Sequence, residues 1–225
     1  MWSTTCAAIA EDHTAITLDA RGHGKSDPHG EISVEQYATD ALTLLDHIGV
    51  ATALVIGLSM GGQAAMHLAL RAPQRVRGLV LADTSLGGRG GAAERMAQTR
   101  ARIEMIGAEA FAEEYTRSRL MSDIDERVVE EFASLVLKTL PDIYVRQVGS
   151  IASQDLRATA LVIAAPTLVI VGANDVSTPP QIAEQLRKAI PGAGIEKIAA
   201  ANHLSNLDRP DAFNGAVAAF LRRFV

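Results

Sequence analysis

The motif Gly57–Gly61, of sequence GLSMG, constrains the fold of this chain more than any other stretch. An apolar, partly β-branched run precedes it at 53–56, and an alanine-rich stretch at 63–72 follows it and ends before Pro73. This order predicts a buried strand, a sharp turn that carries Ser59, and a helix. We expect glycine at both ends of the motif because side chains there would collide with the adjacent strand and helix.

Other apolar runs predict further strands, and apolar residues at helical spacing predict helices between them. The expected strands are Ala15–Leu18, Gly78–Leu81, Thr167–Val171 and, more weakly, Gly194–Ala199. The expected helices run from Val34 to Ile48, where Ser33 and Gln36 have the spacing of a capping box, and begin near Thr178-Pro179 and after Pro210. Strands that alternate with helices predict an α/β fold, with a mostly parallel sheet and helices on both faces.

The stretch 88–160 differs from the rest of the chain, because its charges are interspersed among helix-forming residues and no strand-like run occurs until its end. We therefore expect an all-helical insertion there, and a core made of residues 1–87 and 161–225. A chain of 225 residues is long for a single domain, but an insertion in one α/β domain accounts for the length.

The composition excludes several classes of partner. With 21 basic and 26 acidic side chains the formal net charge is −5, which argues against nucleic acid. The uncharged stretch 48–70 contains polar residues and glycines, so a membrane span is not expected. The single cysteine, Cys6, fits a reducing compartment, and we predict a cytoplasmic protein. No Cys/His cluster or strand-linked G-x-G-x-x-G occurs, so we expect neither a metal nor a cofactor.

A serine hydroxyl is a poor nucleophile unless a base removes its proton, so Ser59 requires a histidine and a carboxylate. Asp175 follows the expected strand at 167–171, and His203 follows the last one. The backbone N–H of Met60, at the start of the helix, is the oxyanion donor nearest the nucleophile. Asp83 also follows a strand and is the alternative acid; otherwise we expect it to be a loop or cap hydrogen-bonder. The other histidines follow no terminal strand and are weaker candidates for the base: His13, His23, His29, His47 and His67.

The chain resembles the α/β-hydrolases, and within them the 3-oxoadipate enol-lactonases and their carboxylesterase relatives. Three blocks carry the likeness: Asp19–Ser26 (DARGHGKS), Gly57–Gly62, and a tail with Gly172–Asp175 (GAND), Thr178–Pro180 (TPP) and His203–Asn206 (HLSN). The order serine, acid, histidine is that of the family. The resemblance implies that Ser59 is the nucleophile, that Asp175 and His203 are its relay, and that the helical insertion is a cap over the pocket.

Two sets of basic residues have weaker assignments. The family's Arg-Gly-His-Gly loop is usually architectural, so Arg21 and His23 are expected to hold a turn rather than to touch substrate. In the insertion, Arg117 or Arg119 is a candidate for binding a substrate carboxylate, as a lactone derived from a dicarboxylic acid would require. The alternative for Arg117 and Arg119 is that they are simply solvated arginines on an exposed helix.

The start of the chain departs from the family pattern. Trp2 looks like the tryptophan that shortly follows the family's His-Gly motif, whose loop gives a second oxyanion N–H. We therefore expect an N-terminally incomplete chain, which lacks that motif and a strand between those at Ala15–Leu18 and Ala53–Ile56.

These features together predict a serine hydrolase that cleaves a small carboxylic ester or lactone through an acyl-enzyme. Two alternatives stay open. One is a non-catalytic ligand-binding member of the same fold, and the other is a cofactor-free perhydrolase with the same triad. The expected partner is a small-molecule substrate, and the sequence makes no prediction of oligomeric state.

Overall fold

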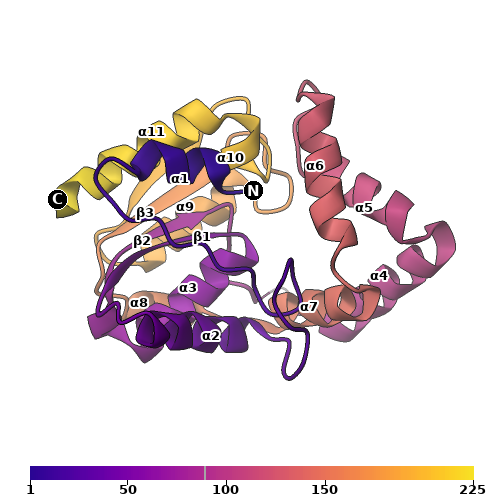
Figure 1. The fold of residues 1–225 in the computed structure, drawn as a ribbon, viewed down its shortest axis with the longest axis horizontal. Helices are drawn as coiled ribbons and strands as arrows, with labels where there is room; N and C mark the ends of the chain where they lie inside the picture. The colour runs from indigo at the N-terminus through magenta and orange to yellow at the C-terminus, as the bar shows by residue number, and fades with distance from the viewer. Residues whose placement is uncertain (89) are drawn as a thin grey trace.

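In residues 1–88 and 90–225, which the computed structural model describes, four parallel strands form one sheet (Figure 1). The strands lie side by side in chain order: β1 (Ala53–Leu58), β2 (Val76–Ala82), β3 (Thr167–Gly172) and β4 (Gly194–Ile198). Because all four run in the same direction, their carboxyl ends meet at one edge of the sheet. The segments that follow β1, β3 and β4 carry Ser59, Asp175 and His203, so this edge brings the candidate site together.

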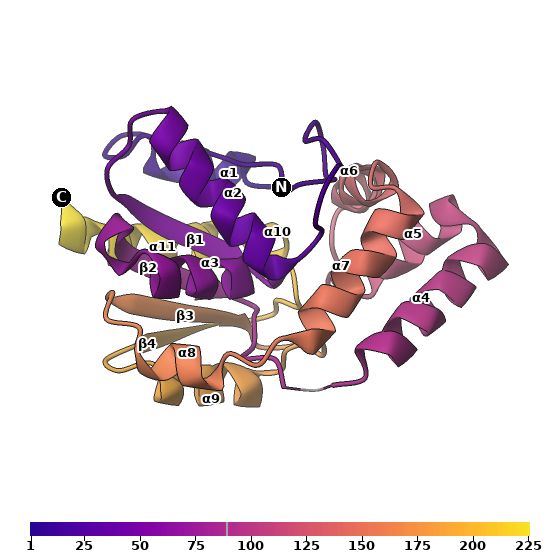
Figure 2. The same cartoon turned by 90° about the horizontal axis from the view of Figure 1, so that it is seen from below.

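Helices cover both faces of the sheet, and the alternation of side chains along β2 shows why. Leu79 and Leu81 point to one face and Val80 and Ala82 to the other, and all four are at most 1% exposed. The first face packs against α2 (Val34–His47), α3 (Met60–Arg71), α8 (Arg157–Leu161) and α9 (Pro180–Ala189). The second packs against α1 (Ser3–Ile9) and α11 (Pro210–Leu221), as Figures 1 and 2 show.

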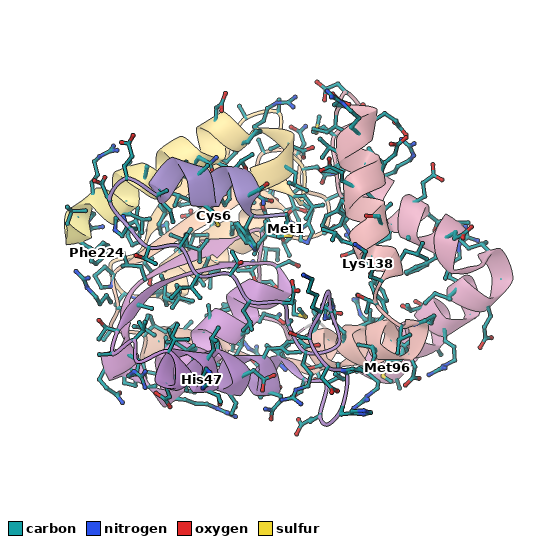
Figure 3. The ribbon with its side chains drawn as sticks, viewed as in Figure 1. Met1, Cys6, His47, Met96, Lys138 and Phe224 are labelled. Carbon is teal, nitrogen blue, oxygen red and sulfur yellow. The ribbon has the colours of Figure 1, made fainter. Side chains whose placement is uncertain are left out.

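Four further helices form a group to one side of the sheet, which Figure 2 shows most clearly. They are α4 (Ala92–Ile106), α5 (Ala108–Arg117), α6 (Glu126–Leu137) and α7 (Pro141–Ser153). Figure 3 shows Met96 and Lys138 within this group, well apart from Cys6 on α1 and His47 on α2. Leu120 and Val129 pack in one apolar cluster with Leu58 and Leu204, so the group lies over the carboxyl edge.

The predicted division at residues 88 and 160 stays a prediction, and the packing of α8 bears on where its second boundary falls. Leu156 and Ala160 belong to the same buried cluster as Leu79 of the sheet, so the chain is already part of the core before residue 161. The short helix α10 (Ser205–Asp208) and two 3₁₀ turns, η1 (Pro73–Arg75) and η2 (Arg222–Phe224), complete the described elements. Within the described residues, no helix is both long and apolar enough to cross a bilayer.

Most predicted elements are confirmed. β1, β2 and β3 include the expected strands at 53–56, 78–81 and 167–171, and β4 ends at Ile198, one residue before the end of the expected strand at 194–199. α2 begins where the capping box predicts, with the Gln36 N–H donating to Ser33 Oγ at 3.1 Å. α3 ends at Arg71, before Pro73 as expected. α9 begins at Pro180, directly after the expected Thr178-Pro179, and α11 begins at Pro210.

The predicted strand at Ala15–Leu18 is wrong. The structure assigns no strand there, and Ile16 and Leu18 are 46% and 45% exposed. An apolar run becomes a strand only when a neighbour pairs with its backbone, and the described pairing of β1 is with β2 alone.

The helix α1 was not predicted. It has only seven residues and no side-chain cap, so neither of the usual helix signals marks it. Tertiary contacts stabilise it instead. The Thr5 hydroxyl donates to Asn214 Oδ1 of α11 at 2.7 Å, and the Trp2 ring lies 6.2 Å from that of Phe213.

Candidate active site

Ser59 lies at the turn between β1 and α3, in a backbone conformation that serine rarely adopts. Its φ is +52° and its ψ is −115°, which costs of the order of 1–3 kcal/mol and persists only where the surroundings enforce it. The Ser59 N–H donates to the Ala82 carbonyl at 2.8 Å, and its carbonyl accepts from Gly62 N–H at 3.0 Å. The next strand and the first turn of α3 therefore hold the serine from both sides.

The glycines of the turn are not equivalent, and the prediction for Gly61 is wrong. A Cβ on Gly57 would lie 2.2 Å from the Gly61 carbonyl oxygen, so only glycine fits there. A Cβ on Gly61 would meet nothing within 4 Å, because the side of α3 on which it lies is open. The second close approach is instead at Gly62, where a Cβ would lie 2.6 Å from Thr84 Cγ2.

His203 connects Ser59 to Asp175. Its Nε2 lies 2.9 Å from Ser59 Oγ, and its Nδ1 lies 2.9 Å from Asp175 Oδ2. An ionised carboxylate only accepts hydrogen bonds, so Nδ1 carries the proton and Nε2 accepts from the serine hydroxyl. His203 is 4% exposed and Asp175 2%, so water competes little for either bond.

The Asp175 carboxylate is held by four donors. Oδ1 accepts from the backbone N–H groups of Ser177 and Thr178, at 2.7 and 2.9 Å. Oδ2 accepts from the Thr178 hydroxyl at 2.7 Å and from His203. Burial by itself acts to raise the pKa of Asp175, but the hydrogen bonds from His203 and Thr178 outweigh it and bring the pKa below its usual value. The carboxylate is therefore ionised and keeps its orientation.

The alternative acid and the other histidines lie in different contacts. The Asp83 carboxyl accepts hydrogen bonds from Gly172 N–H and from Ser205, and Asp175 is the acid at hydrogen-bond distance from His203. His67 Nε2 lies 2.7 Å from Gln154 Oε1, which ties α3 to the end of α7. His29 and His47 are exposed, and His13 is half-buried after α1.

The loop that carries Arg21 and His23 braces the core against α7. The Arg21 guanidinium forms a two-point ion pair with Asp40 of α2, at 3.0 and 2.6 Å. His23 Nε2 lies 2.7 Å from Gln147 Oε1 of α7, and a Cβ on Gly22 would lie 2.6 Å from an Ile143 methyl carbon. These contacts agree with the architectural interpretation of the loop.

The amide of Met60 is available as a donor. It is the first residue of α3, and its N–H has no backbone acceptor among the described residues. The positive end of the helix macrodipole adds to the field at this point. The Met60 side chain packs with Ile32, Tyr37 and Ile143, which fixes the peptide group that follows Ser59.

The two candidate arginines of the insertion differ in their surroundings. Arg117 is about half exposed and forms ion pairs with Glu113 and Glu126. Arg119 donates to the Ser177 hydroxyl, two residues from Asp175, and its guanidinium carbon lies 4.8 Å from the centre of the Tyr115 ring. Its Nε is buried and has no hydrogen-bond partner among the described residues. Arg119 is therefore the one of the two that lies beside the triad.

The segment 118–121, after α5, is bonded directly to the loop that carries His203. The Asn202 side-chain amide donates to the Leu120 carbonyl at 3.2 Å, and the Leu204 N–H donates to the Arg119 carbonyl at 3.1 Å. The Asp208 carboxylate accepts from the backbone N–H groups of Met121 and Asn202. Burial raises the pKa of Asp208 above its usual value. Asn202 and Asp208 received no role in the sequence analysis, although each lies within five residues of His203.

Thr178 was also missed as a functional residue. A local signal for it existed, because an aspartate side chain often accepts a hydrogen bond from the backbone a few residues on, and here Asp175 accepts from both the N–H and the hydroxyl of Thr178.

Among the described residues there is no group of three or more His, Cys, Asp or Glu side chains arranged to hold a metal ion.

Comparison with known proteins identifies the class. The profile of the alpha/beta hydrolase fold family matches residues 1–210, so the chain belongs to the α/β-hydrolases. It is 31% identical to 3-oxoadipate enol-lactonase 2 of Acinetobacter baylyi, over 100% of this chain and 84% of that protein.

Two solved structures are similar over almost the whole chain. The enol-lactonase from Burkholderia xenovorans LB400 has a TM-score of 0.90 and 31% identity, over 98% of this chain and 85% of that one. A thermophilic esterase from Thermogutta terrifontis has a TM-score of 0.91 and 27% identity, over 99% and 84%. These similarities support a hydrolase of esters or lactones.

Proposed function

We propose that this protein is a serine hydrolase that cleaves a small carboxylic ester or lactone through an acyl-enzyme. The observation that carries the proposal is the pair of 2.9 Å contacts that His203 makes, one with Ser59 Oγ and one with Asp175 Oδ2. A serine nucleophile requires a base within hydrogen-bond distance and a carboxylate that orients the base. Ser59, His203 and Asp175 form this series.

The proposed reaction begins when Ser59 Oγ attacks the carbonyl carbon while His203 Nε2 takes the hydroxyl proton. The carbonyl π bond opens, and the Met60 N–H stabilises the resulting oxyanion. The tetrahedral intermediate collapses as the C–O bond to the leaving oxygen breaks, and His203 gives its proton to that oxygen. In a lactone the leaving alcohol stays attached to the acyl group. Water then attacks the acyl carbon while His203 Nε2 accepts its proton. The second tetrahedral intermediate collapses as the bond between this carbon and Ser59 Oγ breaks, and His203 returns the proton to Oγ, which restores the free enzyme and releases the acid.

Asp175 takes no proton in this scheme. It keeps the Nδ1–H tautomer of His203 and stabilises the imidazolium that forms in each half-reaction. Thr178 and the backbone N–H of Ser177 keep the carboxylate in place for that task.

Arg119 suggests a narrower substrate class. Its guanidinium lies beside Ser177 and Tyr115, and its buried Nε lacks a partner in the described structure. A buried donor without a partner is costly, and a carboxylate is the ligand that a guanidinium binds best. We propose that the preferred ester or lactone carries a carboxylate, as the name of the 3-oxoadipate enol-lactonase relatives also suggests.

The test uses a panel of p-nitrophenyl esters and lactones, each with and without a carboxylate. Hydrolysis is measured as the release of acid in a pH-stat. We expect turnover by the wild-type chain and a fall of at least about 10³-fold in Ser59→Ala. Comparable turnover by Ser59→Ala would overturn the proposal. Binding of a lactone without turnover would favour the non-catalytic alternative, and peracid formation from hydrogen peroxide and a short carboxylic acid would favour the perhydrolase.

A further inference from the structure

Three residues at the carboxyl end of β2 contact every segment that carries a member of the triad: Ala82, the last residue of the strand, and Asp83 and Thr84, which follow it. Two of them hold the serine. The Ala82 carbonyl accepts from the Ser59 N–H at 2.8 Å, and the Thr84 hydroxyl donates to the Ser59 carbonyl at 2.6 Å. The peptide groups on both sides of Ser59 are therefore fixed by β2 and the residues that follow it.

Asp83 binds the other two segments through its side chain. Its Oδ1 accepts from the Gly172 N–H at 2.8 Å, at the end of β3 and three residues before Asp175. Its Oδ2 accepts from the Ser205 hydroxyl at 2.5 Å and from the Ser205 N–H at 3.3 Å, two residues after His203. Asp83 and Ser205 are both fully buried, at 0% exposure.

The backbone of Asp83 is also unusual. Its φ is +45°, a left-handed conformation that is uncommon outside glycine, and its N–H donates to the Ile170 carbonyl of β3 at 2.9 Å. Strain of this kind persists where the surrounding contacts enforce it, and it concentrates at functional sites. Here it turns the carboxyl group from the end of β2 toward β3 and the His203 loop.

We propose that Asp83 is a positioning residue, whose carboxyl group sets the distance between the Asp175 segment and the His203 segment. The proposal rests on the proposed function, since it concerns the same triad. Asp83 touches neither reacting atoms nor His203 itself and acts through Gly172 and Ser205. Misplacement of a catalytic group by about 1 Å costs about 10²-fold in rate, so a residue that fixes this spacing controls kcat.

The protonation state of Asp83 decides which amino acid mimics its side chain best. Burial raises its pKa to about 8, against the effect of the donors on Ser205 and Gly172, and the charge of Asp175 adds to the rise. At neutral pH the group is then mostly the neutral acid. In this form the 2.5 Å contact with Ser205 runs in the reverse direction, because the acid O–H donates to Ser205 Oγ, whereas the ionised carboxylate accepts from the Ser205 hydroxyl. An asparagine has the same shape, keeps an oxygen for Gly172 and supplies an N–H for Ser205.

The experiment compares Asp83→Ala, Asp83→Asn and Ser205→Ala by kcat, KM and the rate of labelling by a fluorophosphonate probe. For Asp83→Ala and Ser205→Ala we expect kcat and the labelling rate to fall by about 10- to 100-fold, with KM unchanged, because neither residue touches substrate. Asp83→Asn should lower kcat and the labelling rate by less than about fivefold, since only the Ser205 N–H, at 3.3 Å, loses its acceptor.

The matched control is Thr5→Val, which removes a buried hydroxyl that bonds Asn214 between α1 and α11. It should lower the melting temperature and leave kcat unchanged. The final extent of labelling by the probe counts the molecules that have a reactive serine. It therefore distinguishes a variant with a lower kcat from a variant of which a smaller fraction is folded. If Asp83→Ala does not fold, Ser205→Ala and Asp83→Asn still carry the comparison.

Wild-type kcat in folded Ser205→Ala or Asp83→Ala would overturn the positioning role, and so would an Asp83→Asn variant as impaired as Asp83→Ala. These results differ from a failure of the proposed function, which would appear as undiminished turnover in Ser59→Ala. An inactive Ser59→Ala together with a fully active Asp83→Ala would leave the triad in place and remove only this inference.

Discussion

His203 Nε2 lies 2.9 Å from Ser59 Oγ, although 144 positions of the chain separate the two residues. The contact exists because parallel strands bring their carboxyl ends to one edge of the sheet, and both residues lie just beyond such an end. The catalytic proposal therefore depends on the sheet as much as on the side chains.

The role of Asp175 is tested by Asp175→Asn. An asparagine keeps the shape of the side chain but can present an N–H to His203 Nδ1, which favours the wrong tautomer, so we expect kcat to fall by about 10⁴-fold. Steady-state kinetics on the best ester of the panel measures the effect. The matched control is Asp142→Asn, an exposed partner of Arg100, which should retain full activity. A loss of less than about tenfold in Asp175→Asn would argue against the assignment.

The two glycines of the turn should respond differently to alanine. Gly57→Ala places a Cβ 2.2 Å from a backbone oxygen, so we expect severe loss of stability or failure to fold. Gly61→Ala meets no neighbouring atom within 4 Å and lies in a helix, where alanine is favoured over glycine by about 0.5–1 kcal/mol. Thermal unfolding followed by circular dichroism should show an unchanged or higher melting temperature. Equal destabilisation by both substitutions would contradict this account of the turn.

Substrate charge should separate the two arginines. Arg119→Gln is expected to raise KM by about 10- to 100-fold for a carboxylate-bearing ester and to leave KM for a neutral ester of equal size unchanged, since a hydrogen bond to a charged group contributes about 1.5–3 kcal/mol. Arg117→Gln is the matched control, because its guanidinium is occupied by Glu113 and Glu126. If Arg119→Gln weakens both substrates alike, the carboxylate preference is wrong.

The buried acid should make stability depend on pH. The pKa of Asp83 is about 8 in the folded protein and ordinarily 3.8, so between these values the native state binds more protons than the unfolded state. Stability from this group is therefore lost as the pH rises through that window. Asp83→Asn lacks the ionisation, so its melting temperature relative to wild type should rise from pH 5 to pH 9. A difference that stays constant with pH would show that Asp83 is already ionised at pH 5.

Much of the fold was predictable from local patterns. Strands such as β2 and β3 are buried on both faces and are continuous apolar runs, and α2 begins at a recognisable cap. The positions of Ser59, Asp175 and His203 after expected strands, together with their order along the chain, predicted that these side chains meet, with Asp83 as the alternative acid.

The errors come from contacts between distant segments. The run at 15–18 has the composition of a strand but no partner, and α1 has weak helix signals but packs on α11. Asp83 was considered as an alternative acid or as a loop or cap hydrogen-bonder. Its partners Gly172 and Ser205 were not predicted, because these bonds cross 89 and 122 positions and leave no signal in the sequence nearby.

The central claim is that Ser59 is the nucleophile, and covalent labelling tests it most directly. The intact protein is incubated with a fluorophosphonate, its mass is measured, and the adduct is located by peptide mapping. We predict one adduct on Ser59, none in Ser59→Ala, and much slower labelling in His203→Ala, whose missing imidazole no longer removes the hydroxyl proton. An adduct on another residue, or equal labelling of Ser59→Ala, would contradict the account.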